Sequence, residues 1–189
     1  MRPDGRPNGP NRPQAARVFF ALWPDDAALD VLDRVAREGA SRFGGNATRR
    51  ETQHLTLAFL GDVPLDRLPA LNEAAGRVVA PAFAFTLDRL GYWRHNRILW
   101  AGCSGNEPAL AGLVRRLVGE LQAVGARVDG GSRPFVPHVT LVRKVRENPL
   151  ALPDLPAVRW TCHEFVLLRS RLSAAGAAYE TLGRWPLAH

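Results

Sequence analysis

Histidine and threonine recur together at one spacing in two places along this chain. His54 and Thr56 stand in one apolar segment, and His138 and Thr140 stand in another. Successive side chains of a β-strand point to opposite faces, so in a strand each histidine shares a face with its threonine. Both segments are rich in residues that favour strands. The repetition indicates one active site assembled from two matching strands.

Two histidines that face one cleft can share a proton near neutral pH, because the ordinary pKa of histidine is about 6.5. Such a pair suits the hydrolysis of a phosphoester, since the attacking water loses a proton and the leaving oxygen gains one. Each threonine hydroxyl can donate a hydrogen bond to a non-bridging phosphate oxygen. No carboxylate cluster or metal-ligand spacing accompanies the motifs. We therefore expect catalysis without a metal and without a cofactor.

Composition narrows the setting of this chemistry. The chain has 189 residues, of which 46% are hydrophobic, and this is enough for the core of one domain. A net charge of +7 favours a polyanionic partner such as RNA, although an arginine bias inherited from a GC-rich genome would give the same charge. No apolar run approaches the roughly 20 residues that span a bilayer, and the polar N-terminus lacks a secretory pattern. We expect a cytoplasmic protein without membrane association.

Hydrophobic periodicity divides the chain into a tail and an α+β domain with mainly antiparallel strands. Residues 1–16, dense in Pro, Gly, Asn and Arg, predict a flexible N-terminal tail, and residues 17–189 a single domain. Gly39 is predicted to end the first helix, and segments 83–87 and 97–101 to pair as a hairpin. The predicted strands are 18–23, 53–60, 83–87, 97–101, 137–145, 159–171 and 177–185, and the predicted helices are 25–38, 65–79 and 107–124.

The two motifs lie 84 residues apart, and a helix precedes each motif strand. This order indicates a duplicated half with a pseudo-two-fold axis between the motifs.

The chain resembles the 2H phosphoesterases, in particular the RNA 2′,3′-cyclic phosphodiesterases that were first described as 2′-5′ RNA ligases. The resemblance extends from about Arg17 to Leu187. Besides both motifs, the residues that carry it are Arg17–Pro24, Leu60-Gly61, Arg133–Pro137, Tyr179-Glu180 and Arg184–Leu187. It implies a bilobal fold in which two mainly antiparallel sheets are flanked by helices. Each of the two pseudo-symmetric lobes would contribute one motif strand to an active-site cleft between them.

The resemblance also implies a reaction, the hydrolysis of a terminal 2′,3′-cyclic phosphate to a 2′-phosphate. His54 resembles the proton donor for the leaving 3′ oxygen, and His138 the proton acceptor that activates water. Thr56 and Thr140 complete the catalytic set. The symmetry of the site leaves the two histidine roles exchangeable on the residues alone. The reverse reaction, with an RNA 5′-hydroxyl in place of water, would give a 2′-5′ linkage.

Three further residues are candidates for substrate binding. Phe20 resembles the family's cleft-facing aromatic, which could stack on the terminal base, although packing in the core would equally suit its position. Arg133 enters the second motif from a loop. Arg143 follows Thr140 by three residues, so in a regular strand it faces away from His138, and only a bulge or the strand end would turn it inward.

The expected partners are RNA ends or 2′,3′-cyclic nucleotides, bound by a monomer. Two alternatives stay open. One is a module that binds RNA ends without turnover. The other is a 2H phosphoesterase that acts on ADP-ribose cyclic phosphate or on 2′-5′ oligoadenylate.

Overall fold

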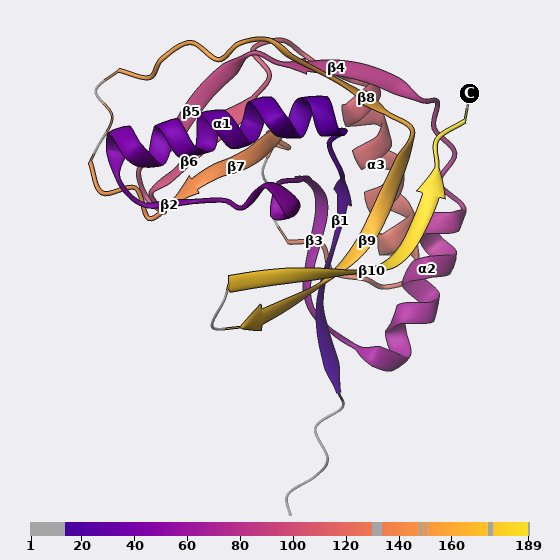
Figure 1. Cartoon of the computed structure of the whole chain (residues 1–189). Helices are drawn as coiled ribbons and strands as arrows, with labels where there is room; N and C mark the ends of the chain where they lie inside the picture. Colours follow the sequence, from indigo (N-terminus) through magenta and orange to yellow (C-terminus); the bar gives the residue numbers. More distant parts are fainter. Residues whose placement is uncertain (1–13, 130–133, 148, 150, 174–175, 189) are drawn as a thin grey trace, which may run out of the picture.

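A computed structural model describes residues 14–129, 134–147, 149, 151–173 and 176–188 (Figure 1). It confirms an α+β fold with two antiparallel sheets flanked by helices. The strands are β1 (Ala15–Leu22), β2 (Asn46–Ala47), β3 (Leu55–Pro64), β4 (Phe83–Leu87), β5 (Arg89–Trp93), β6 (Ile98–Gly102), β7 (His138–Arg143), β8 (Val158–Cys162), β9 (Glu164–Ser173) and β10 (Gly176–Pro186). The helices are α1 (Asp26–Phe43), α2 (Leu68–Gly76) and α3 (Pro108–Ala123), with short 3-10 turns η1 (Arg50–Thr52) and η2 (Leu65–Arg67).

The two motif strands lie side by side in the middle of the larger sheet. Its order is β10-β9-β1-β3-β7-β6-β5, with β2 paired to β7, while β4 and β8 form the smaller sheet. β3 and β7 meet at one residue pair, Leu55 opposite Val139. The sheet therefore joins two halves through a narrow contact between the motifs.

The helices cover one face of this sheet and leave the other open. α1, which follows β1, packs on β7 of the other half, and α3, which follows β6, packs on β3 (Figure 1). Leu55 and Val139 are fully buried in the same core cluster as Leu32 of α1 and Leu117 of α3. Because side chains alternate along a strand, His54, Thr56, His138 and Thr140 point to the opposite, helix-free face.

The first helix runs further than its sequence predicted. Asp25 caps its N-terminus, where its carboxylate accepts a hydrogen bond from the Ala28 N–H at 2.8 Å. Gly39 does not end the helix, which continues to Phe43 and stops at Gly44, whose φ is +69°. A Cβ atom at Gly39 would lie 2.7 Å from Leu99 Cδ2. Glycine is therefore needed here for close helix–sheet packing rather than for a turn.

The predicted pairing of 83–87 with 97–101 is wrong. β4 pairs instead with β8, and β6 pairs with β5, which the sequence analysis missed. Asp88 separates β4 from β5, since its N–H donates to Gly102 O and its carboxylate accepts from Ser104 N. The predicted strand 159–171 likewise divides at His163 into β8 and β9, which belong to different sheets.

The domain begins two residues earlier than predicted. β1 starts at Ala15, and Gln14 O accepts a hydrogen bond from Leu65 N at 2.9 Å. Residues 1–13 of the predicted tail lie outside the described residues. In the part of the chain that the structure describes, no helix has the length and hydropathy needed to cross a membrane.

Candidate active site

The register of β3 and β7 brings the four motif side chains together. The strands are antiparallel and Leu55 lies opposite Val139, so His54 lies opposite Thr140, and Thr56 lies opposite His138. Directly opposed side chains on one face of such a pair have Cβ atoms about 5 Å apart. Each histidine therefore faces the threonine of the other motif, and the four polar groups surround one point on the open face.

Both histidines are held in the same way. His54 Nδ1 lies 2.8 Å from Thr52 O, and His138 Nδ1 lies 2.8 Å from Val136 O, so each ring contacts the carbonyl two residues before it. A carbonyl oxygen only accepts, which places the proton of the neutral ring on Nδ1. Nε2 of each ring is then the atom that can take up or release a proton.

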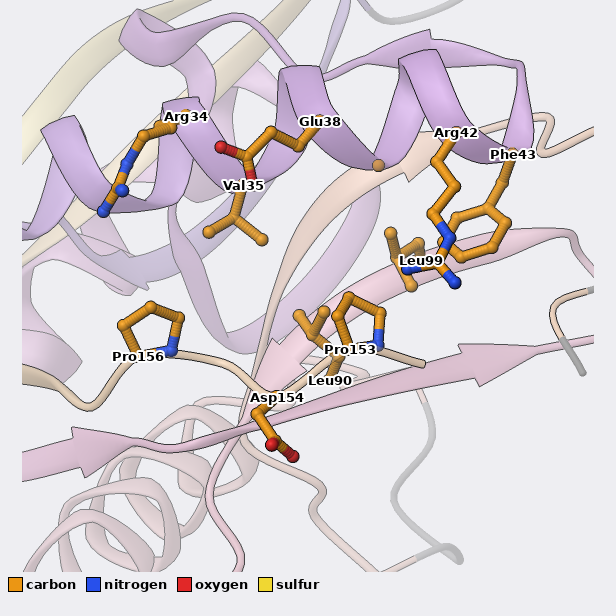
Figure 2. A pocket seen from close by; sticks show the side chains of 11 residues that line it. Arg34, Val35, Glu38, Arg42, Phe43, Leu90, Leu99, Pro153, Asp154 and Pro156 are labelled. Carbon is orange, nitrogen blue, oxygen red and sulfur yellow. The ribbon is translucent and has the colours of Figure 1, made fainter. Parts of the chain in front are cut away.

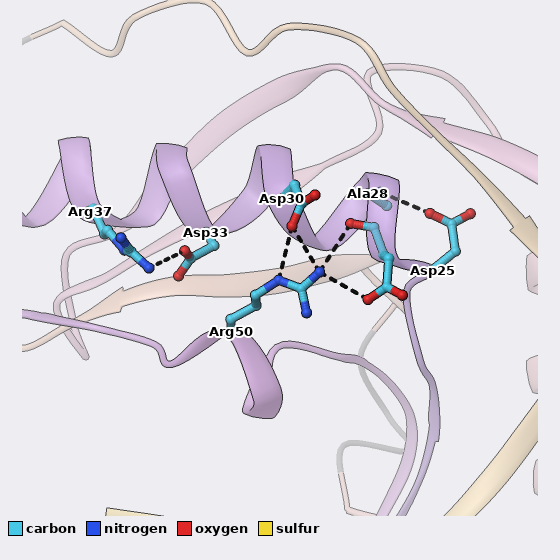
Figure 3. Close-up of polar contacts among 7 residues, drawn as sticks. Asp25, Ala28, Asp30, Asp33, Arg37 and Arg50 are labelled. Atoms are coloured by element: carbon cyan, nitrogen blue, oxygen red, sulfur yellow. Dashed lines mark hydrogen bonds and ion pairs between the residues drawn. The ribbon is translucent and has the colours of Figure 1, made fainter.

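The turn before His54 is tied to α1 and to the second motif. Arg50 donates to the side chains of Asp26 and Asp30 in the first turns of α1, at 2.9 and 2.8 Å (Figure 3). Gln53 is fully buried, and its Nε2 donates to Thr48 O at 3.0 Å.

Thr48 N in turn donates to Leu141 O of β7 at 2.7 Å. Gln53 and Thr48 thus link the turn before His54 to the strand that carries His138.

Burial makes both histidines hard to protonate in the free protein. The pKa of His54 falls to about 4, mainly because burial penalises the charged ring, with smaller contributions from the charges of Arg143 and His138. Burial also lowers the pKa of His138, and the charge of Arg143 adds to the effect. Both rings are therefore neutral near pH 7 in the free protein.

Aromatic rings supply this burial. His54 packs against Phe19 with 4.8 Å between ring centroids, and against the edge of Tyr179 at 5.1 Å. Trp23 stacks nearly parallel to it at 6.2 Å. On the other side, Trp93 meets His138 edge-on at 4.5 Å. The two histidine rings thus have separate aromatic walls, one from each half.

A β-bulge follows each motif threonine and changes which side chains face the site. In β3 the bulge inserts Leu57, since Phe20 pairs with Ala58 and Ala21 with Thr56. In β7 it inserts Leu141, since Leu99 pairs with Val142 and Trp100 with Thr140.

Arg143 is exposed on the face of His138, because the bulge shifts the alternation of β7 by one residue, and its charge reaches both histidines. Its role as a phosphate ligand stays a prediction.

Comparison with known proteins identifies the family of this chain. Residues 23–174 match the model of the 2′-5′ RNA ligase superfamily. The chain belongs to this superfamily. A curated member, RNA 2′,3′-cyclic phosphodiesterase of Escherichia coli K12, is 33% identical over 176 residues, which cover 90% of this chain and 96% of that protein.

Solved structures of the superfamily share the whole fold. The crystal structure of E. coli LigT in apo form matches with a TM-score of 0.83 and 29% identity, and covers 93% of this chain and 99% of that one. E. coli LigT complexed with 3′-AMP matches with a TM-score of 0.83 and 28% identity, and covers 93% and 100%. The two-half architecture around β3 and β7 is therefore that of a superfamily member.

The prediction that Phe20 faces the cleft is wrong. Phe20 is fully buried and packs against Phe165 at 6.3 Å and Trp185 at 5.7 Å, on the helix side of the sheet. Its neighbour Phe19 contacts His54 instead. Residues 18–23 are apolar without alternation, so the sequence alone could not assign the face. Arg133 lies outside the described residues.

The sequence did not predict the positions of Trp23 and Trp93 beside the two histidines. The residue pattern around them gives little indication of these positions, because the pairing of distant strands brings each tryptophan to its histidine.

Two hollows mark the opposite sides of the sheet. A groove of about 580 Å³ opens beside Trp23 and Tyr179, next to His54, and continues over β9 and β10. A smaller hollow of about 240 Å³ lies under α1, where Val35 and Leu99 line it together with Pro153 of the connection to β8 (Figure 2). Leu99 belongs to the core face, so this second hollow is separated from the histidines by the sheet. Of these two hollows, the groove is the one that adjoins the site.

Within the described ranges, no group of three or more His, Cys, Asp or Glu side chains is placed to hold a metal ion.

Proposed function

We propose that this superfamily member hydrolyses the 2′,3′-cyclic phosphate at RNA ends or on nucleotides to a 2′-phosphate. The observation that carries the proposal is the crossed pairing of the two motifs. It sets two histidines, each with its Nδ1 engaged, against two threonines around one point. The relative from E. coli that is named RNA 2′,3′-cyclic phosphodiesterase points to the substrate.

The reaction needs one proton to leave water and one to reach the 3′ oxygen. His138 Nε2 takes the proton of the attacking water as its oxygen bonds to phosphorus. The bond from phosphorus to O3′ breaks, and His54 Nε2 delivers its proton to O3′. The phosphate stays on O2′, and the two histidines exchange protons with solvent to begin again. Thr56 and Thr140 donate hydrogen bonds to the non-bridging oxygens, and Arg143 offsets the negative charge.

The aromatic enclosure of His54 suits its role as the general acid. A ring whose pKa is about 4 in the free protein becomes a strong proton donor once it is protonated. The negative charge of the bound cyclic phosphate raises the pKa of both rings, so substrate binding itself favours the protonated state. In reverse, an RNA 5′-hydroxyl in place of water forms a 2′-5′ phosphodiester from the same groups.

Alanine variants of the two histidines test the proposal. His54→Ala and His138→Ala are each expected to lower kcat for 2′,3′-cyclic AMP by at least about a hundredfold, because general acid–base catalysis typically contributes that much. His95→Ala, in the exposed turn after β5, is the matched control. Wild-type rates in either site variant would refute the two-histidine mechanism. Activity that EDTA abolishes and a divalent ion restores would replace it with a metal-dependent one.

We further propose that the chain is one domain of two pseudo-symmetric lobes that works as a cytoplasmic monomer. The continuous sheet across β3 and β7 supports one domain, and a single chain supplies all four motif residues. Light scattering on the purified protein tests the monomer.

A further inference from the structure

A guanidinium group lies over an aromatic ring on the open face, beyond the first motif. Arg17 precedes Phe19 by two residues in β1, so it shares the face of Phe19 and His54, and it is exposed while Val18 between them is fully buried. The Arg17 guanidinium carbon lies 4.8 Å from the centre of the Phe59 ring. Phe59 stacks in turn on Phe19 at 6.4 Å, and Phe19 contacts His54. A continuous row of side chains leads from the catalytic centre to Arg17.

The duplication gives this arrangement a counterpart in the second half. Phe59 and Arg143 occupy equivalent positions, because each is the third residue after its motif threonine and follows the same bulge. In the second half this position supplies a guanidinium directly. In the first half it supplies a ring, and Arg17 of the neighbouring strand places a guanidinium over that ring. Each motif strand therefore has one positive charge beyond its threonine.

The guanidinium groups of Arg143 and Arg17 do not lie near the same group of the site. The charge of Arg143 contributes to the lowered pKa of His54 and of His138, whereas Arg17 contributes to neither. Along β1, Arg17 is four residues from Ala21, the partner of Thr56, which is about 13 Å of strand. The side chain bends back over Phe59 and shortens this distance. Arg17 thus lies outside the reacting phosphate and within a short stretch of RNA backbone from it.

Arg17 is also available to bind an anion. Among the described residues it forms no ion pair within 4 Å, even though Asp62 is its register partner in β3. Contact with an aromatic face restricts a guanidinium that would otherwise move freely, and this lowers the entropy cost of binding. Arginine is also the side chain best suited to phosphate.

We propose that Arg17, held over Phe59, binds the phosphodiester that precedes the cyclic phosphate end, so that RNA oligonucleotides are better substrates than 2′,3′-cyclic mononucleotides. The inference rests on the proposed function and adds a second phosphate subsite to it. The terminal nucleotide occupies the histidine–threonine centre, and the chain leaves it toward Phe59 and Arg17. Arrangements of basic and aromatic side chains of this kind bind single-stranded RNA with little sequence preference.

The test compares two substrates with the same cyclic end, one of which carries an extra phosphodiester and the nucleoside attached to it. These are adenosine 2′,3′-cyclic phosphate and the dinucleotide ApA with the same cyclic end. The wild-type protein is expected to give a kcat/KM at least about fivefold higher on the dinucleotide, and Arg17→Gln is expected to bring that ratio close to one. One phosphate contact on a single strand also contributes about 0.7 to the slope of log affinity against log salt. The dinucleotide slope should flatten by about that amount in Arg17→Gln.

Arg159→Gln is the matched control, because Arg159 is exposed on the smaller sheet and its loss removes the same charge. Its dinucleotide-to-mononucleotide ratio should remain that of the wild type. Phe59→Leu keeps an apolar side chain but removes the ring under Arg17, and it should reduce the ratio in the same direction. Circular dichroism on each variant verifies the fold.

Equal kcat/KM values on the two substrates in the wild type would overturn the subsite, as would a ratio that Arg17→Gln leaves unchanged. Absence of hydrolysis of either substrate would overturn the proposed function instead. Fluorescence anisotropy with a labelled ApA dinucleotide then tests the subsite alone. Binding that Arg17→Gln does not weaken would overturn the subsite there too.

Discussion

The depressed pKa of His54 makes the stability of this protein depend on pH in a way that one substitution removes. An unfolded chain holds a histidine with a pKa of about 6.5, whereas folding lowers the pKa of His54 to about 4. Between these values the unfolded state binds more protons than the folded state, so stability rises with pH across this window. The free energy of unfolding therefore has its full value, as far as His54 is concerned, above pH 6.5, and it falls as the pH is lowered toward 4.

The size of the effect follows from the two pKa values. At pH 5 the unfolded histidine is almost fully protonated and the folded one is almost neutral, and the linkage relation gives a loss of about 2 kcal/mol relative to pH 7.5. The full difference at lower pH is about 3 kcal/mol. His54→Gln cannot titrate, so the variant should lose about 2 kcal/mol less than the wild type between pH 7.5 and pH 5. The contribution of His138 has the same sign and cancels in the comparison.

Urea unfolding at fixed ionic strength, at pH 7.5 and pH 5, measures this difference. The free energies of unfolding of wild type and His54→Gln define it, and His95→Gln in the exposed turn is the control for the loss of any histidine. If wild type and His54→Gln lost the same free energy of unfolding between pH 7.5 and pH 5, the aromatic enclosure would not keep His54 neutral.

Three further predictions follow from the site. Gly91→Ala should destabilise the protein by about 1–3 kcal/mol in urea unfolding, because the new Cβ would lie 2.0 Å from the Trp100 ring. Gly112→Ala, in α3 with open space around it, should instead stabilise the protein by up to about 1 kcal/mol. Equal effects of the two substitutions would contradict close packing of Trp100 on Gly91. Thr140→Val, which keeps shape and removes the hydroxyl, should lower kcat/KM about a hundredfold in steady-state assays, and wild-type kinetics would exclude the hydrogen bond to phosphate. The kcat/KM profile should peak below pH 6.5, because burial lowers the pKa of both motif histidines, and a peak above that pH would contradict their proposed acid and base roles.

Sequence patterns were sufficient to predict the two motif strands because their signal is local. The alternation around His54 and His138 predicted strands whose polar residues share a face, and both strands are present. The α+β class and the three helices followed from periodicity in the same way. A helix stripe or a strand alternation is encoded within about ten neighbouring residues, which a single sequence contains.

What the sequence missed depends on contacts between distant segments. The bulges at Leu57 and Leu141 leave no mark in the residue pattern, because leucine suits a regular strand equally well. They decide that Arg143 faces the site. Phe19 and Phe20 are identical in type, and only the pairing of β1 with β3 and β9 distinguishes the cleft side chain from the core one. Strand partners such as β4 and β8 are set by tertiary packing in the same way.

The measurement that tests the central claim most directly is phosphorus NMR of adenosine 2′,3′-cyclic phosphate after incubation with the protein. It identifies which ribose oxygen keeps the phosphate. The crossed histidine and threonine pairs, with His54 as the acid at the 3′ oxygen, predict adenosine 2′-phosphate as the only product, formed in the presence of EDTA. Accumulation of the 3′-phosphate, or an unchanged cyclic phosphate signal, would contradict the account.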